Sequence, residues 1–174
     1  MRRLMVAMLG SVLSCAALES AAADQSDKAW IESSNTYTNQ FLDVQLQHSP
    51  ESGSRQGVAK YDEYISDPTL ADEMAERHEF EAVLKKVDAA RTKETDKRVQ
   101  EDLTILHKAF DLQFRQQDYS LQHELPFYNA SEIIFQGLRS LLDDQVTPER
   151  RAAAVVRLRK YTGVEPGRDR KSVV

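Results

Sequence analysis

Apolar residues recur at helical spacing along most of the chain, in segments separated by polar stretches that contain glycine or proline. The first segment runs from about Ser26 to Gln47, and its apolar positions fall on one helical face. The second begins at Asp67, a capping residue, and Pro68, which suits the first helical position. A third segment covers about 97–122 and has a strongly polar outer face. No stretch alternates over a long enough run to predict a sheet.

Two shorter helices are predicted after the third segment. Ser131 can cap the first of them, which is apolar on more than one side and is therefore expected to be the most buried element. Thr147 and Pro148 open the last helix, and Gly163 supplies a left-handed stop. The pattern predicts an all-α helical bundle of about five helices, three long and two short. The apolar residues of the fourth helix are Ile133, Ile134, Phe135, Leu138, Leu141 and Leu142.

The first 23 residues have the order of a secretory signal peptide. Two arginines precede an apolar run, which is followed by small residues, and Ala21 and Ala23 mark the best cleavage site. The apolar run is well short of the ~20 residues that span a bilayer, so we expect no transmembrane helix. The pattern predicts an exported protein, periplasmic or extracellular.

Cys15 offers a second way of processing the same segment. The sequence that ends in Cys15 weakly resembles a bacterial lipobox, which would give an outer-membrane-anchored lipoprotein, although Leu13 fits that pattern poorly. Ordinary cleavage is favoured over this lipid anchor. Since Cys15 is the only cysteine, cleavage after Ala23 leaves a mature chain that cannot form an internal disulfide.

Composition and charge narrow the classes of partner. The net charge of −5 and the pI near 5.4 give no electrostatic footprint for nucleic acid, so no nucleic-acid partner is expected. The charged fraction of 29% beside 41% hydrophobic residues suits amphipathic helices. One run near the C-terminus is basic but holds few aromatic residues, and we expect it to be a solvated face. Its residues are Arg150, Arg151, Arg157, Arg159 and Lys160.

Two histidines begin a helical zinc-peptidase motif without completing it. The motif His-Glu-x-x-His works because residues four apart share a helical face and can bind one metal ion. His78 is followed by glutamate, but Ala82 occupies the position of the second histidine. His123 is also followed by glutamate, with Phe127 in that position. Neither sequence predicts a metal site.

His107 and Asp111 are four residues apart on the third predicted helix. A two-ligand metal site is conceivable, but a solvated histidine–carboxylate pair is favoured on a helix so rich in charge. No Gly-x-Ser-x-Gly turn or glycine-rich phosphate loop is present. The sequence therefore predicts no catalytic, cofactor-binding or metal-ligating residue in this chain.

The last six residues, 169–174, resemble a short sequencing adapter translated in one frame. On that interpretation they are a non-native tail, and the natural chain continues past about Arg168. We therefore expect 1–23 to be the signal peptide and 24–168 to be part of a longer, incomplete helical domain.

The order and spacing of caps and apolar residues between Asn129 and Tyr161 resemble the N-terminal part of the bacterial DUF885 family. Ser49-Pro50-Glu51-Ser52 and Gly57, upstream, belong to the same resemblance. The resemblance implies an exported or lipid-anchored helical parent similar to zinc metallopeptidases, with a peptide-like substrate. The family's metal motif, His-Glu followed by Pro-Gly-His-His, lies downstream and is not in this sequence. We therefore expect a scaffold segment that is inactive alone. The alternative is a complete small exported helical bundle that binds a partner.

Overall fold

The chain forms helices joined by short connections, and the computed structural model describes residues 13–125 and 127–166, with side chains from Lys28 onward except at position 126. No strand occurs within these ranges, so the predicted all-α class is confirmed. The longer helices are α1 (Leu13–His48), α3 (Leu70–Arg91), α4 (Lys97–His123), α5 (Ala130–Leu142) and α7 (Ala153–Tyr161). Short helical turns lie between them: α2 (Pro50–Arg55), the 3-10 turn η1 (Ala59–Tyr61) and α6 (Pro148–Arg151).

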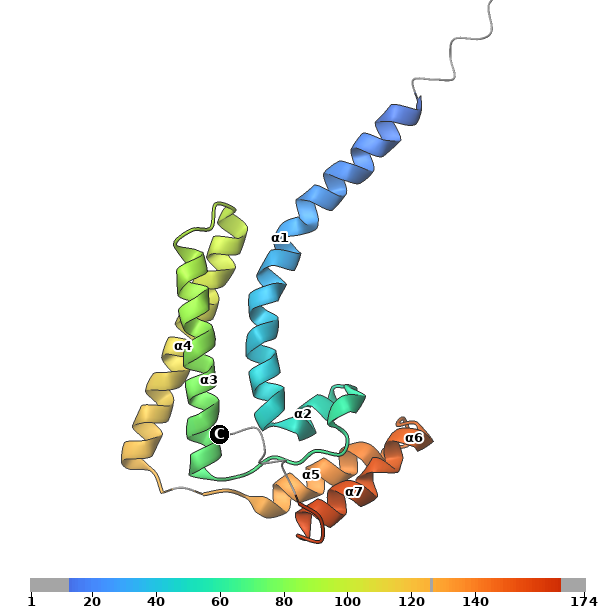
Figure 1. Cartoon of the computed structure of the whole chain (residues 1–174), viewed down its shortest axis with the longest axis vertical. Coiled ribbons are helices and arrows are strands. Elements are labelled where there is room, and N and C mark those ends of the chain that lie inside the picture. The colour runs from blue at the N-terminus through green and yellow to red at the C-terminus, as the bar shows by residue number, and fades with distance from the viewer. Residues whose placement is uncertain (1–12, 126, 167–174) are drawn as a thin grey trace, which may run out of the picture.

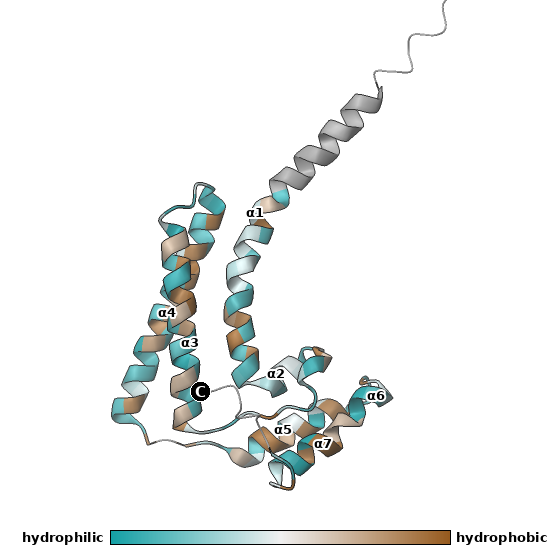
Figure 2. Ribbon diagram, viewed as in Figure 1, coloured by the Kyte–Doolittle hydropathy of each residue, from teal (hydrophilic) through white to brown (hydrophobic). Residues whose placement is uncertain are grey.

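Helices α1, α3 and α4 pack into a three-helix bundle (Figure 1). Phe41 of α1 stacks on Phe110 of α4 with ring centroids 3.7 Å apart, and Phe80 of α3 lies 5.0 Å from Phe110. Hydrophobic and hydrophilic residues alternate within the turns of α3 and α4 (Figure 2), as the sequence pattern predicts. Burying each large apolar side chain stabilises the fold by about 1.5–3 kcal/mol. The buried members of this core are Phe41, Val44, Phe80, Val83, Val87, Val99 and Leu103.

Two of the predicted helix caps are wrong by two residues. Helix α3 is capped by Thr69, whose hydroxyl accepts a hydrogen bond from the backbone N–H of Asp72 at 3.2 Å, and not by Asp67. Helix α5 is capped by Asn129, while the predicted cap, Ser131, is already helical. An N-cap residue needs non-helical dihedral angles, so a residue inside the first turn cannot serve.

The first and last helices also differ from prediction. Helix α1 begins at Leu13 rather than near Ser26, because its alanine-rich start favours helix. The backbone at Cys15, Ala21 and Ala23 is therefore helical, but their side chains lie outside the described residues, as do residues 1–12 and 167–174. The predicted fifth helix is divided at Ala152 into α6 and α7. Gly163 has φ +74°, which confirms the predicted left-handed stop.

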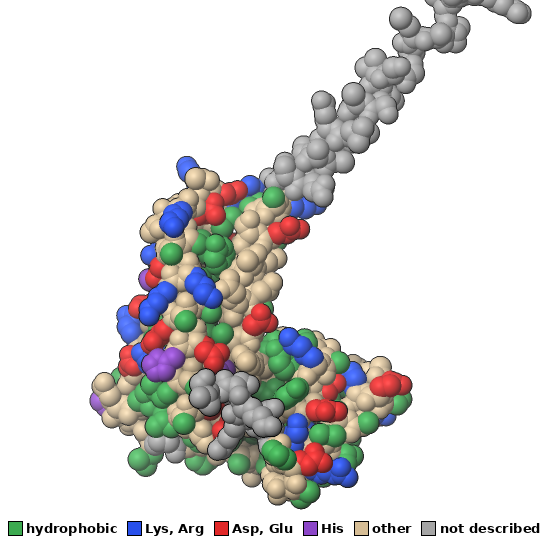
Figure 3. Space-filling view, viewed as in Figure 1, with side chains coloured by type: hydrophobic (Ala, Val, Ile, Leu, Met, Phe, Trp, Pro, Cys, Tyr) green, Lys and Arg blue, Asp and Glu red, His purple; other side chains and the backbone are tan. Residues whose placement is uncertain are grey.

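A smaller helical layer crosses the end of the bundle where α1 stops (Figure 1). In it, α5 packs on α7 and also contacts α2. Its apolar core is small and consists of Leu141, which is fully buried, with Ala153, Ala154 and Leu138. Charged side chains of both signs are scattered over the bundle and this layer in the face shown in Figure 3. None of the helices in the described residues has the length and apolarity to cross a membrane.

Candidate functional site

Arg157 on α7 is the centre of the smaller layer and is completely buried. Its guanidinium donates hydrogen bonds to the backbone carbonyls of Tyr61 at 2.9 Å, Tyr64 at 3.1 Å and Gly137 at 2.7 Å. Burial lowers the pKa of Arg157, and the nearby carboxylates of Glu51 and Asp62 oppose that shift. One side chain thus ties the loop after α2 to both α5 and α7.

Glu51 of α2 collects three donors on a single carboxylate oxygen. The hydroxyl of Tyr161 donates to Glu51 Oε1 at 2.8 Å, and Ser66 donates from its backbone N–H at 2.9 Å and its hydroxyl at 3.2 Å. Burial, reinforced by the Glu51 charge, raises the pKa of Tyr161. A Cβ atom at Gly137 would collide with the Tyr161 hydroxyl, so α5 needs glycine where α7 approaches it.

Asp62 and Arg150 form an ion pair within this layer. Arg150 donates to both Asp62 oxygens at 2.7 Å and to the Ser54 carbonyl at 2.8 Å, while the Ser54 hydroxyl donates to Asp62 at 2.7 Å. Burial alone would raise the pKa of Asp62, but the hydrogen bonds from Arg150 and Ser54 outweigh it and the pKa is lowered. Bidentate pairing of this kind fixes orientation as well as charge.

These contacts form one polar clamp, defined by Glu51, Asp62, Arg150, Arg157 and Tyr161. The prediction that the basic run is a solvated face is therefore wrong for Arg150 and Arg157, although Arg159 is exposed. A signal was present in the sequence, because Arg157 shares a helical face with Ala153, Ala154 and Tyr161. The clamp satisfies its polar groups internally and so acts as a support for α5.

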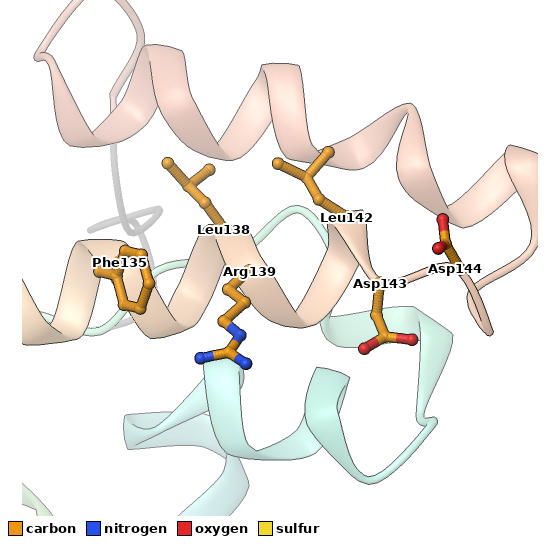
Figure 4. A pocket seen from close by; sticks show the side chains of 6 residues that line it. All are labelled: Phe135, Leu138, Arg139, Leu142, Asp143 and Asp144. Atoms are coloured by element: carbon orange, nitrogen blue, oxygen red, sulfur yellow. The ribbon is translucent and has the colours of Figure 1, made fainter.

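The open surface of this layer is a groove along α5 of about 540 Å³. Leu138 and Leu142 point to one side of α5 in Figure 4, and Arg139 and Asp143 point to the other. The fourth helix was expected to be the most buried, but Phe135 is 56% exposed and Leu142 is 60% exposed. The layer has too few large side chains to cover an apolar helix on more than one side. The α5 groove is lined by Phe135, Leu138, Arg139, Leu142, Asp143 and Asp144.

His48 is buried at the end of α1, facing acidic residues of α3. Its Nδ1 lies 3.0 Å from Asp72 Oδ2, and its Nε2 lies 3.3 Å from Glu79 Oε1. Burial raises the pKa of the neighbouring Glu76; His48 opposes this shift, and the adjacent carboxylates add to it. Because both ring nitrogens face carboxylates, His48 joins α1 to α3.

The other histidines make local pairs. His107 Nδ1 lies 2.8 Å from Asp88 Oδ1 of α3, so the predicted pairing with Asp111 is wrong, since Asp111 pairs with Arg115 one turn along α4. His78 is exposed near Glu81 at 3.5 Å, and the ring of His123 lies 4.5 Å from that of Tyr119. Within the described residues, no group of three or more histidine, cysteine or acidic side chains is arranged to hold a metal ion.

The chain matches no family model, and it shows no significant similarity to curated proteins or to solved structures.

Proposed function

We propose that this chain is the N-terminal scaffold segment of an exported protein similar to the DUF885 family, whose parent is a metal-dependent peptidase. The observation that carries the proposal is the exposed apolar face of α5, where Phe135 and Leu142 are both more than half exposed. Contiguous exposed apolar surface is typical of a site that another part of a protein covers. The polar clamp supports this role because it holds α5 in place from the opposite side.

The chemistry of the parent is assigned by the resemblance and not by residues of this segment. The resemblance implies zinc, which would activate a water molecule to attack a peptide-like substrate. Within the residues that the structure describes, no three histidine, cysteine or acidic side chains come together as a ligand set for such an ion. We therefore assign α5 and α7 a role in scaffolding, and by analogy with the family we propose that they also form a wall of the parent's substrate channel.

The decisive experiment is to read the genomic DNA beyond the codon for Arg168. We expect an open reading frame that continues into a segment with His-Glu and Pro-Gly-His-His. A natural stop codon near Gly167 would contradict the scaffold proposal.

A self-contained exported bundle that binds a partner is the second candidate. It is favoured by the two closed cores, in which Leu103, Leu141 and Arg157 are completely buried within this chain. Binding of a hydrophobic dye separates the two candidates. A scaffold segment without its neighbours binds the dye at the α5 groove, whereas a monomer that melts cooperatively and binds no dye supports the self-contained bundle.

A further inference from the structure

We infer that the α5 groove docks one amphipathic helix, which runs antiparallel to α5 and carries a basic residue at the start of its apolar stripe. The inference rests on the proposed function, in which the rest of the parent protein covers the α5 groove. It specifies the kind of helix that would do so.

The apolar floor of the groove has the spacing that a helix recognises. Phe135, Leu138 and Leu142 are three and four residues apart, so their side chains form a single row along α5. The groove is open to solvent and is not an enclosed cavity. A helix can lay its own row of side chains beside this one, as ridges pack into grooves between helices.

The charged side chains at the rim of the groove are Arg139, Asp143 and Asp144. Within the described residues, Arg139, Asp143 and Asp144 form no ion pair. Arg139 lies 5.9 Å from the centre of the Phe135 ring, and Asp143 accepts a hydrogen bond from the backbone N–H of Gln145 at 2.9 Å. An incoming side chain can therefore pair with any of the three without breaking an existing ion pair.

These charges set the direction of the docked helix. Asp143 and Asp144 follow the last residue of α5, where the helix dipole is also negative, and Arg139 lies one turn earlier. The occupant therefore needs a basic residue opposite Asp143 and Asp144, and an acidic residue opposite Arg139. In the antiparallel direction the N-terminal end of the docked helix, where its dipole is positive, also lies beside Asp143 and Asp144 and attracts them.

The test uses the full chain and two synthetic amphipathic helices of about five turns, long enough to be partly helical in water. Both peptides carry the same leucine stripe and a fluorophore, and they differ only in having lysine or glutamate at the N-terminal end of the stripe. We expect the lysine peptide to bind about fivefold more tightly at low salt, because two exposed charge pairs are gained. Replacing both Asp143→Lys and Asp144→Lys should reverse the preference, whereas Glu101→Lys with Asp111→Lys on α4 should leave it in place.

The apolar row is tested with a matched pair of serine variants. Leu142→Ser should weaken both peptides about tenfold, and Leu112→Ser, at a similarly exposed position on α4, should weaken neither. These positions are at the surface, so circular dichroism should show that every variant retains its helices. Equal binding of the two peptides, or insensitivity to Leu142→Ser, would overturn the inference. Dimerisation of the free chain that Leu142→Ser abolishes would overturn it as well, because the occupant would then be a second copy.

The outcomes also separate this inference from the proposed function. A stop codon near Gly167 together with charge-dependent peptide binding would refute the scaffold role and retain the groove as a docking site. A continuing reading frame together with equal binding of the two peptides would retain the scaffold role and refute the groove as a docking site for this helix.

Discussion

The substitution Arg157→Met tests whether the buried guanidinium holds the smaller layer together. Methionine occupies much of the same volume without a charge, so packing is largely kept while three hydrogen bonds to Tyr61, Tyr64 and Gly137 are lost. The acceptors are backbone carbonyls, which remain after the substitution, so Arg157→Met leaves these carbonyls without their donor.

The expected loss of stability follows from these partners. A hydrogen bond to a charged group contributes about 1.5–3 kcal/mol, which gives a gross contribution of about 4.5–9 kcal/mol for three. Burial of the charge costs several kcal/mol, and methionine avoids that cost. Two of the three bonds are only partly buried, so water can reach those carbonyls after a small rearrangement. We therefore expect a net loss of about 3 kcal/mol.

The assay must distinguish the smaller layer from the bundle. The fluorescence of Trp30, which packs against the bundle core, reports urea unfolding of α1, α3 and α4. Amide hydrogen exchange reports each part separately. We expect protection to fall in 50–66 and 130–161 while the bundle stays protected. Arg159→Met, two residues along the same helix and exposed, is the matched control and should change stability by less than about 0.5 kcal/mol.

Two results would refute the reasoning. If Arg157→Met unfolds within about 0.5 kcal/mol of the unsubstituted chain, the hydrogen bonds do not stabilise the layer. If protection instead falls equally in the bundle and in the smaller layer, Arg157 acts on the whole chain and the clamp is not a local support.

Three further predictions concern Gly137 and Asp62 of the smaller layer and Glu76 of the bundle. Gly137→Ala should cost about 1–3 kcal/mol in urea unfolding, because its Cβ collides with the Tyr161 hydroxyl, and Tyr161→Phe should relieve part of that cost in a double-mutant cycle; additive effects would contradict the collision. Asp62→Asn should cost about 3 kcal/mol at pH 7 with Asp111→Asn as a near-neutral control. Because the folded pKa of Asp62 is lowered, its stabilisation is present above the unfolded value of 3.8 and is lost as pH falls through the folded value, so a difference that persists in strong acid would count against it. Glu76→Gln should raise the melting temperature at pH 7 and have little effect below pH 4.5. Because the folded pKa of Glu76 is raised above 4.5, the fold is destabilised when the pH rises through the folded pKa and the buried carboxyl ionises, and glutamine removes that cost. A lower melting temperature of the variant at pH 7 would show that this sign is wrong.

The bundle could be predicted from sequence because its core residues repeat at helical spacing on one face of each helix. Val87, Val99 and Leu103 are completely or almost completely buried, as that spacing requires. The partners of the clamp residues could not be predicted, because cations near the end of a helix are normally solvated and favoured by the helix dipole. The sequence held a signal only for the burial of Arg157, which shares a helical face with Ala153 and Ala154. Only the approach of the 61–64 carbonyls gives Arg157 its partners, and local sequence does not encode an approach between residues more than 90 positions apart.

The α5 groove lies between these two cases. Its apolar residues were visible in the sequence, but their exposure was not, because periodicity identifies an apolar face without showing whether this chain covers it. Phe135 and Leu142 lie on a face that this chain leaves open, while Leu141, one residue away, is completely buried. Exposure depends on how many large side chains the other helices contribute, and α7 contributes mainly Ala153 and Ala154.

The polar clamp also imposes an order on folding during synthesis. Helices α3 and α4 are joined by a short connection and can pair as soon as both have emerged from the ribosome. Glu51, by contrast, waits 110 residues for Tyr161, and the Tyr61 carbonyl waits 96 residues for Arg157. The segment around α2 therefore emerges early and acquires its fixed position last, when α7 appears. Between the emergence of α4 and that of α7, the nascent chain consists of a bundle and a loop that is not yet held in place, and the smaller layer can close once residue 161 has emerged.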